Sequence, residues 1–243
     1  MQDSLMQIPA QKQQADSTQK QQPDSTQKQQ AGPTRMQGAI TLEDSIHARL
    51  DAAYTKLVAH RDYQGRKSGM KEGTPALVLL GDLQKLYFIR RRNNELEVIK
   101  EYPVSTGIDG FGNKYDEQRT PTGTLMIVGK KGEDAPIGTA FVADEPIRIA
   151  KPHEPGKKAV MTSRMLVLDG SDYANRKVFD RVIRIHGTNK EKYIGKPASD
   201  GCIRMKNKDV VELFDFVKWG TLLYIEPKPE GIALKDMRPV KMQ

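Results

Sequence analysis

Between residues 76 and 225 the sequence is a succession of short apolar segments separated by turn-forming pairs such as Gly-Asp and Asn-Asn. Short segments rich in Val, Ile, Leu and Tyr, bounded by such turns, are typical of β-strands. The predicted strands are 76–80, 85–90, 96–104, 124–128, 139–142, 147–150, 164–168, 182–186 and 222–225. Many short strands with few helices predict a mainly β sandwich or barrel, although the order of strand pairing does not follow from one sequence.

Two helices are predicted beside these strands. The first begins at Thr41, because Thr41 and Asp44 fit a capping box and apolar residues then recur on one face, namely Ile46, Leu50, Ala53 and Leu57. The second covers residues 209–218, with Asn207 as its predicted cap and one apolar face made of Val210, Leu213, Phe214 and Val217. The sequence therefore predicts one helix before the strands and a short one near their end.

The N-terminal region is of a different kind. Residues 12–19 and 20–27 repeat one octapeptide of Lys, Gln, Asp, Ser and Thr, with Ala or Pro at its fourth position. No residue of this repeat can bury an apolar face, so it predicts a disordered tether. The predicted organisation is a disordered tail at 1–37, a helical extension at 38–72, a catalytic domain at 73–227 and a C-terminal tail at 228–243.

The net charge is 39 − 31 = +8, which suits an anionic partner. Nucleic acid is not favoured, because the best basic run, Arg90–Arg92, is followed by two Asn and has no stacking aromatics interleaved. Membrane contact is not indicated, because no apolar stretch approaches the ~18 residues that span a bilayer. Residues 1–10 also lack the basic start and apolar core of a secretory signal.

The chain has one cysteine, so an internal disulfide and a cysteine-rich zinc site are both excluded. His47 and His60 have no second ligand at metal spacing and are predicted to be solvent-edge residues. His153 is predicted to be a surface residue of an exposed loop at 149–158, with a role in a substrate lid as the alternative. We therefore expect neither a metal nor a cofactor.

The context of the cysteine is the segment from Arg184 to Asn207, RIHGTNKEKYIGKPASDGCIRMKN. It places His186 at the end of an apolar strand and returns through a turn-rich loop to Cys202. A thiol near its ordinary pKa of about 8.5 needs a neighbouring base or cation to act as a nucleophile. His186 is the only histidine that one strand–loop–strand excursion brings beside Cys202, so the pair is the candidate for thiol catalysis.

Residues around the cysteine suit acyl transfer. Gly201 permits close approach of a substrate, and the backbone N–H groups of Gly201 and Cys202 are candidate donors to a developing oxyanion. Arg204 shares the face of Cys202 if the chain is extended there, and it offers a bidentate partner for a substrate carboxylate. The plainer alternative is a buried cysteine in a core.

The sequences IHGTN (185–189) and SDGCIRM (199–205) resemble the signature of the YkuD-type L,D-transpeptidase catalytic domain. The likeness extends upstream to YPVSTG (102–107) and TPTGTLMIV (120–128), and covers roughly residues 76–226. It implies a mainly β fold, with Cys202 as nucleophile and His186 as base.

By the same resemblance, a backbone carbonyl at or near Gly187 orients the imidazole, and Ser199 and Gly201 surround the oxyanion site. Arg204 matches a polar position that lines the active site. Asp200 departs from the pattern, because the motif has a second histidine there. An anion beside Cys202 raises the thiol pKa, whereas one directed at the imidazolium stabilises an ion pair, and both alternatives stay open.

The resemblance implies a cell-wall enzyme without cofactor. The thiolate attacks a peptidoglycan tetrapeptide stem, releases the terminal D-alanine and leaves a thioester, which an amine of a second stem resolves into a cross-link. Resolution by water, as in carboxypeptidase-type trimming, is the alternative. Such work belongs in the periplasm or cell envelope, although no signal peptide is visible. A sortase-like thiol transpeptidase and a non-catalytic peptidoglycan-binding module are the other candidates.

Overall fold

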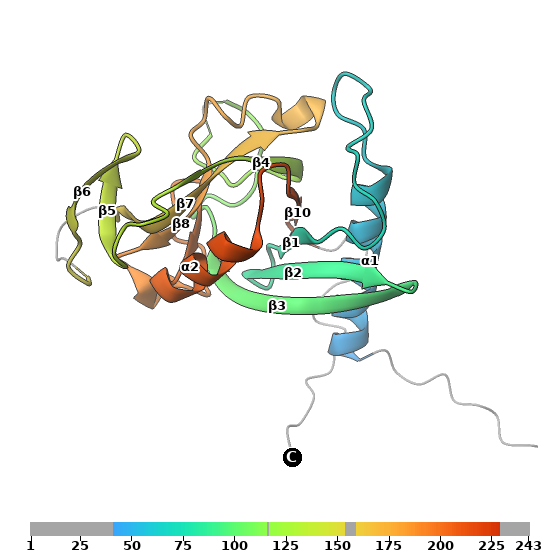
Figure 1. Cartoon of the computed structure of the whole chain (residues 1–243), viewed down its shortest axis with the longest axis horizontal. Coiled ribbons are helices and arrows are strands. Elements are labelled where there is room, and N and C mark those ends of the chain that lie inside the picture. The colour runs from blue at the N-terminus through green and yellow to red at the C-terminus, as the bar shows by residue number, and fades with distance from the viewer. Residues whose placement is uncertain (1–40, 116, 154–158, 229–243) are drawn as a thin grey trace, which may run out of the picture. The chain divides into compact units, whose positions relative to one another are not determined.

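The computed structural model of the chain describes residues 41–115, 117–153 and 159–228. Within them, ten strands pair into one sheet in the order β4-β10-β1-β2-β3-β9-β8-β7-β5-β6, and β4 also pairs with β7. The second pairing closes the sheet into a barrel, and β5 and β6 extend from it at the end opposite the first helix (Figure 1). The mainly β fold expected from the sequence is confirmed. The predicted tail at 1–37, and all but residue 228 of the one at 228–243, lie outside the described residues.

The strands are β1 (Ala76–Leu80), β2 (Lys85–Arg92), β3 (Glu95–Ser105), β4 (Gly123–Lys131), β5 (Thr139–Val142), β6 (Glu145–Ile149), β7 (Met161–Gly170), β8 (Arg184–Thr188), β9 (Ile203–Met205) and β10 (Leu222–Glu226). The α-helices are α1 (Leu42–Ala59) and α2 (Asn207–Phe216), and the 3₁₀ helices are η1 (Tyr173–Asn175) and η2 (Glu191–Tyr193). All nine predicted strands are present. The tenth, β9, is the short extended segment directly after Cys202.

Three boundaries differ from prediction for local reasons. Strand β8 begins at Arg184 and not at residue 182, because Val182 has a φ of 56°, which a strand does not accept. Strand β7 begins at Met161 and not at residue 164, because a bulge at Ser163 (φ 66°) lets residues 161 and 162 also pair with β8. Helix α2 is capped by Lys206, so the prediction that Asn207 is the cap is wrong; Asn207 is the first residue of the helix.

The barrel wall separates two apolar cores. Strand β1 is buried along its whole length because its side chains alternate between them. Leu77 and Leu79 point into the main core inside the barrel, together with residues of β3, β4, β7, β8, β9 and α2. Val78 and Leu80 point outward into a second core beneath α1.

Helix α1 closes this second core. It presents Leu50, Ala53, Tyr54 and Leu57 to the outer face of β1, β2 and β10. Its N-terminus has the predicted capping box of Thr41 and Asp44. Arg49 adds a largely buried polar link, with its guanidinium 2.6 Å from Asp82 and 2.8 Å from Glu226. The helix thus packs directly on the barrel, on its right-hand side in Figure 1.

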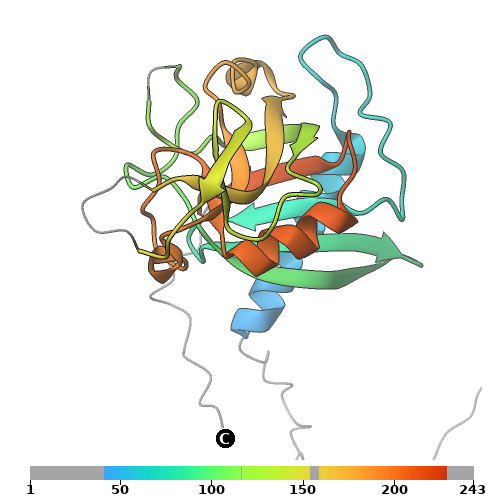
Figure 2. The same ribbon diagram turned by 60° about the vertical axis from the view of Figure 1, so that its left-hand side comes forward.

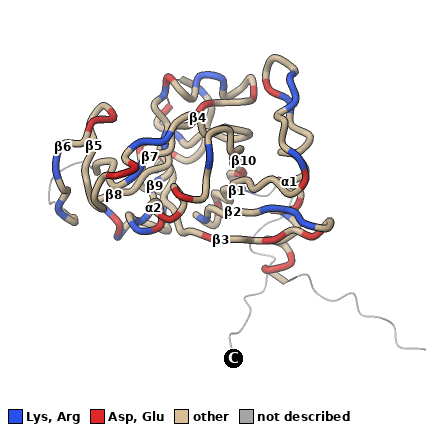
Figure 3. The backbone as a smooth tube through the Cα atoms, viewed as in Figure 1, with Lys and Arg blue, Asp and Glu red and all other residues tan. Residues whose placement is uncertain are grey.

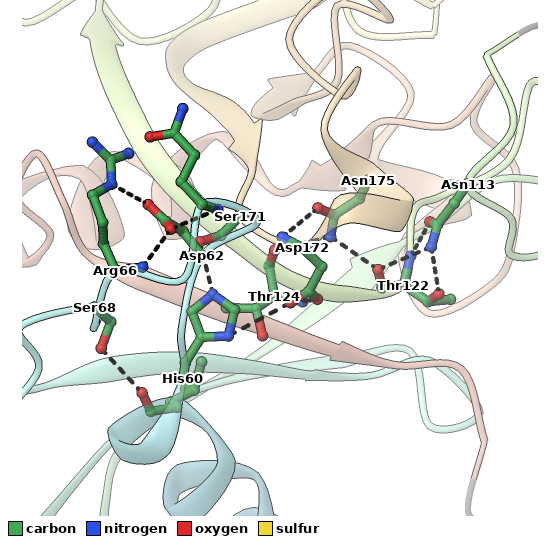
Figure 4. A network of polar contacts seen from close by, with 12 residues as sticks. His60, Asp62, Arg66, Ser68, Asn113, Thr122, Thr124, Ser171, Asp172 and Asn175 are labelled. Atoms are coloured by element: carbon green, nitrogen blue, oxygen red, sulfur yellow. Dashed lines mark hydrogen bonds and ion pairs between the residues drawn. The ribbon is translucent and has the colours of Figure 1, made fainter.

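The segment after α1 is tied to the barrel by a polar network (Figure 4). The ring of His60 lies 2.8 Å from the Ser171 hydroxyl and 3.5 Å from Asp172, which in turn accepts the Thr124 N–H. The side chain of His60 is only 7% exposed, so the prediction of a solvent-edge residue is wrong. His47 is exposed as predicted, as is His153.

Basic residues are interspersed with acidic ones along the backbone (Figure 3). In the run from Arg90 to Arg92, Arg90 pairs with Glu97 at 2.7 Å and Arg91 pairs with Asp51 at 2.6 Å. Neither of these two cations is therefore free for a polyanion. Of the two helices in the described part of the chain, neither has the length and apolar character needed to cross a membrane.

Candidate active site

Strands β8 and β9 position the candidate catalytic residues. They pair in parallel inside the barrel wall, with Ile185 opposite Ile203 and His186 opposite Arg204. Ile185 and Ile203 are fully buried in the main core, so His186 and Arg204 project from the other face of the two strands. Cys202 lies two residues before Arg204 and shares that face, which is the extended geometry that the sequence required.

The strand register sets the separation of the thiol and the imidazole. Extending the pairing by one residue places Cys202 opposite Arg184, one strand spacing away. His186 is then the diagonal neighbour of Cys202. Spacings of ~4.8 Å across and ~6.6 Å along the strands give a Cα–Cα diagonal of roughly 8 Å, which the two side chains can bridge.

The imidazole of His186 is held in one orientation. Its side chain is 3% exposed, and Nδ1 lies 2.7 Å from the carbonyl oxygen of Gly187. A carbonyl only accepts, so Nδ1 carries the proton and Nε2 is left as the basic nitrogen. The Gly187 carbonyl therefore makes the contact that the resemblance places at or near this residue. A Cβ at Gly187 would approach the Thr162 carbonyl oxygen to 2.6 Å, so only glycine fits here.

Burial lowers the pKa of His186 to about 4, and the charges of Arg204 and Arg184 act in the same direction. The Gly187 carbonyl opposes this shift. At neutral pH the imidazole is therefore uncharged and able to accept a proton. A neutral, oriented imidazole is the form that a general base requires.

The thiol of Cys202 is also held in its neutral form. Burial raises its pKa, against the backbone N–H of Arg184 and the charges of Arg204 and Arg184. The sulfur donates to the Val182 carbonyl oxygen at 3.6 Å. The resting site is thus a neutral thiol and a neutral imidazole, so the proton must move as attack occurs.

The turn before Cys202 is held by its own side chains. Ser199 is fully buried; its hydroxyl donates to the Cys202 carbonyl at 2.6 Å and accepts the Gly201 N–H at 3.1 Å. The Gly201 N–H is therefore occupied, which contradicts the prediction that it faces an oxyanion. The Cys202 N–H makes no hydrogen bond within the described part of the chain and remains the backbone donor available there.

A threonine that the sequence analysis did not single out completes this turn. Thr120, in the TPTG segment, is fully buried and donates to the Gly201 carbonyl at 3.0 Å. Its hydroxyl also accepts the Gly107 N–H at 2.8 Å. The loop from 107 to 121 is thereby fixed against the nucleophile turn. The likeness of TPTGTLMIV to the family is the signal that could have pointed to this residue.

Arg204 and Asp200 lie beside the thiol and interact with each other. Arg204 donates to the Ala198 carbonyl at 2.6 Å, and its Nη2 lies 3.9 Å from Asp200 Oδ2. Asp200 is 70% exposed. Its charge raises the thiol pKa, but less than the other groups that act on the thiol change it. Of the two alternatives for Asp200, the structure favours a mild rise in the thiol pKa, with the carboxylate turned toward Arg204.

Arg181 and Asn207 are supporting residues that the sequence analysis did not place in the site. Arg181 joins the segment before β8 to the 107–121 loop, because its guanidinium donates to three carbonyls of that loop, those of Gly112, Glu117 and Arg119. Asn207 receives the Thr162 and Ser163 hydroxyls and donates to the Thr188 carbonyl. Both residues hold the strands and loops that carry the thiol and the imidazole.

A groove of about 480 Å³ opens beside Arg204 and Asp200. Its other lining residues are Ile108, Gln118, Ala159, Lys190, Tyr193 and Ala198. A larger hollow of about 710 Å³ lies between residues 68–75 and the connection from α2 to β10, and none of the predicted site residues lines it. In the described ranges, no three His, Cys, Asp or Glu residues are placed to hold a metal ion.

The backbone at Gly201 gives a prediction. Its φ of 112° lies where side chains are rarely tolerated, and a Cβ would meet the Arg119 carbonyl oxygen at 3.0 Å. Gly201→Ala should cost about 1–3 kcal/mol of stability in urea unfolding and lower the acylation rate at least tenfold. Gly195→Ala is the matched control, because Gly195 also has a positive φ (93°) but has no atom within 4 Å of its Cβ position. Equal acylation rates in the two variants would contradict this account.

The fold and site define a class of protein. The imidazole of His186 on β8 and the thiol of Cys202, directly before β9, lie on neighbouring segments of the barrel wall, and Arg204 of β9 lines a groove there. The family model of the L,D-transpeptidase catalytic domain, YkuD, matches residues 76–225, which is well over half of the chain. The chain therefore belongs to the L,D-transpeptidase catalytic domain family, as its sequence led us to expect, and the expectation of a transpeptidase is confirmed at that level.

The chain is also similar to individual proteins. YqjB of Bacillus subtilis (strain 168), described as an L,D-transpeptidase, is 29% identical over 160 residues, which are 64% of this chain and 80% of that protein. ErfK/SrfK of Escherichia coli (strain K12), also described as an L,D-transpeptidase, is 47% identical over 186 residues, and the chain spans 51% of its length. A solved L,D-transpeptidase from Xylanimonas cellulosilytica aligns with a TM-score of 0.39 at 19% identity, over 76% of this chain and 69% of that one.

Proposed function

We propose that this chain is a cysteine-dependent L,D-transpeptidase that acts on the stem peptides of peptidoglycan through a thioester on Cys202. The observation that supports the proposal is that His186, with Nδ1 bonded to the Gly187 carbonyl and Nε2 left as the basic nitrogen, lies on β8, which pairs in parallel with β9 directly after Cys202. The rival interpretation of Cys202 as an inert core residue is weakened, because the residue is partly exposed and projects from the face opposite the main core.

The proposed reaction has two stages. In the first, Nε2 of His186 takes the thiol proton as the sulfur attacks the carbonyl of the third stem residue. The C–N bond to the terminal D-alanine then breaks, and the imidazolium returns the proton to the leaving amine. In the second stage, an amine of another stem attacks the thioester, loses its proton to His186 and restores the thiol. Water in place of that amine gives the trimming reaction.

The neutral resting state defines how the base works. Since burial lowers the imidazole pKa and raises the thiol pKa, a preformed thiolate–imidazolium pair is not the main species. His186 therefore acts at the moment of attack and not before it. The Cys202 N–H supplies one hydrogen bond to the developing oxyanion.

The proposed substrate is the tetrapeptide stem, which carries free carboxylates. Arg204, two residues after Cys202, lines the groove that it shares with Asp200 and is the candidate receptor for a carboxylate on the acyl side of the scissile bond. The net charge of +8 is compatible with an anionic wall polymer. Peptidoglycan is found in the cell envelope, so we place the protein there.

Intact-mass spectrometry of the wild-type protein tests the proposal. Incubation with a stem tetrapeptide should give a species heavier by the tripeptide acyl group, with D-alanine released in equal amount. Addition of a second stem should return the free enzyme and form a cross-linked product. A carbapenem should add its mass at Cys202. If neither the tetrapeptide nor the carbapenem adds mass, a peptidoglycan-binding module becomes the better description.

A further inference from the structure

The face that carries Cys202 and His186 also carries two arginines, and the strand register gives their arrangement. Arg204 pairs with His186 across the two strands, and Cys202, directly before β9, lies beside Arg184, whose backbone N–H reaches the sulfur. The thiol, the imidazole and the two arginines are therefore neighbours at this end of the paired strands. The following inference rests on the function proposed above.

The two arginines differ in their partners. Arg204 has Asp200 at 3.9 Å, so its charge is partly balanced. Arg184 has no carboxylate partner in the described ranges, although it is only 6% exposed. Its Nη1 donates to the Ile183 carbonyl at 3.1 Å, and its buried Nε makes no hydrogen bond to the described residues, as is also true of the Nε of Arg204. The ring of Phe179, itself 51% exposed, lies 5.8 Å from the guanidinium carbon.

A buried cation without an anion is costly, and proteins retain one where a ligand supplies the missing charge. The planar guanidinium with free donors matches a carboxylate in shape as well as in charge. Arg181, the other cation near the thiol, is already committed to three backbone carbonyls. Arg184 is therefore the least satisfied positive group beside the nucleophile.

We propose that Arg184 binds the free α-carboxylate of the residue that leaves when Cys202 is acylated. The carboxylate carbon of that residue is separated from the scissile carbonyl by only the amide nitrogen and one Cα, less than one residue length of ~3.3–3.6 Å. The charges of both Arg184 and Arg204 act on the thiol, but Arg204 already has an acidic partner, Asp200 at 3.9 Å. The carboxylate keeps its bonds throughout and departs with the released amino acid.

This arrangement selects a substrate class. The enzyme requires a scissile bond one residue from a free C-terminus and discriminates against stems that continue beyond it or end in an amide. Arg184 is in this sense a specificity-determining residue. Arg204, on the other side of the thiol, is left for the retained part of the stem.

The test compares acylation of the full chain by two donors, a stem tetrapeptide and the same peptide with a C-terminal carboxamide. The wild type should react with the free acid roughly 10–100-fold faster, the factor that a charge-assisted hydrogen bond supplies. Arg184→Gln should bring this ratio close to one, and Arg184→Lys should keep part of it. Arg176→Gln is the matched control, because Arg176 is exposed, stacks on Tyr173 and is predicted to leave the ratio unchanged.

The ratio of the acylation rates with the free acid and with the carboxamide separates the possible results. A loss of thiol reactivity or of folding slows both donors equally, so only a carboxylate contact changes their ratio. If the wild type shows no preference, or Arg184→Gln keeps it, the carboxylate role of Arg184 is overturned while the transpeptidase proposal stands. If neither donor acylates the wild type, the proposed function fails, and this inference fails with it.

Discussion

Cys202→Ala should form no acyl-enzyme with a stem tetrapeptide or with a carbapenem. The thiol is the only one in the chain, and no neighbouring side chain can replace it as a covalent nucleophile. The expected fall in the rate of D-alanine release is on the order of 10⁴-fold or more, as for removal of other catalytic nucleophiles. Intact-mass spectrometry and release of D-alanine measure the two parts of this prediction.

The fold should survive this substitution, which makes the result interpretable. The sulfur donates one long hydrogen bond, to Val182 at 3.6 Å, and accepts from the backbone N–H of Arg184, and the residue is partly exposed. Urea unfolding should therefore change by no more than about 1 kcal/mol. A variant that unfolds like the wild type yet still accumulates the tripeptide acyl group would show that the nucleophile is not Cys202.

Local sequence patterns were sufficient for most of the secondary structure. The capping box of Thr41 and Asp44 and the spacing of the apolar residues defined α1, and the alternation of turns and apolar segments defined nine strands. The boundaries failed where the backbone has an unusual φ, at Val182 and Ser163, because nothing in those residue types requires a left-handed conformation.

The candidate site was predictable in its centre and not in its surroundings. His186 and Cys202 were found from residue type and spacing, since one short loop joins their strands. Thr120 and Arg181 reach the site from segments that only the closed barrel brings close, so no local pattern assigned them a role there. Arg184 was within reach of sequence analysis, because it lies two residues before His186 on the same strand and must share its face.

Two interpretations of the site and its surroundings failed for different reasons. The Gly201 N–H looked available for an oxyanion, but it donates to the hydroxyl of Ser199, a local contact two residues away of the kind that serine often makes. His60 looked like a solvent-edge residue at the end of a helix, but it packs against Ser171 and Asp172 (Figure 4). Only the partners of His60 are determined by tertiary packing, because Ser171 is 111 residues away along the chain.

Replacement of the base should have the second largest effect. His186→Gln removes the proton acceptor and should lower the acylation rate by about 10²–10⁴-fold, the range for loss of a general base. His60→Gln is the matched control: His60 is also buried and hydrogen-bonded, but it belongs to the network that ties α1 to the barrel. It should lose stability and keep its acylation rate. Equal losses of rate in both variants would contradict the role of His186.

The dependence of rate on pH separates a base from a merely structural histidine. The reactive state needs a neutral imidazole, which exists above its pKa of about 4, and a protonated thiol, whose pKa is raised by burial. The wild-type rate should therefore rise through pH 4 and then stay level up to the thiol pKa. Without the imidazole, attack needs a thiolate formed by solvent, so the rate of His186→Gln should climb about tenfold per pH unit over the same range. A level profile in the variant would show that another group takes the proton.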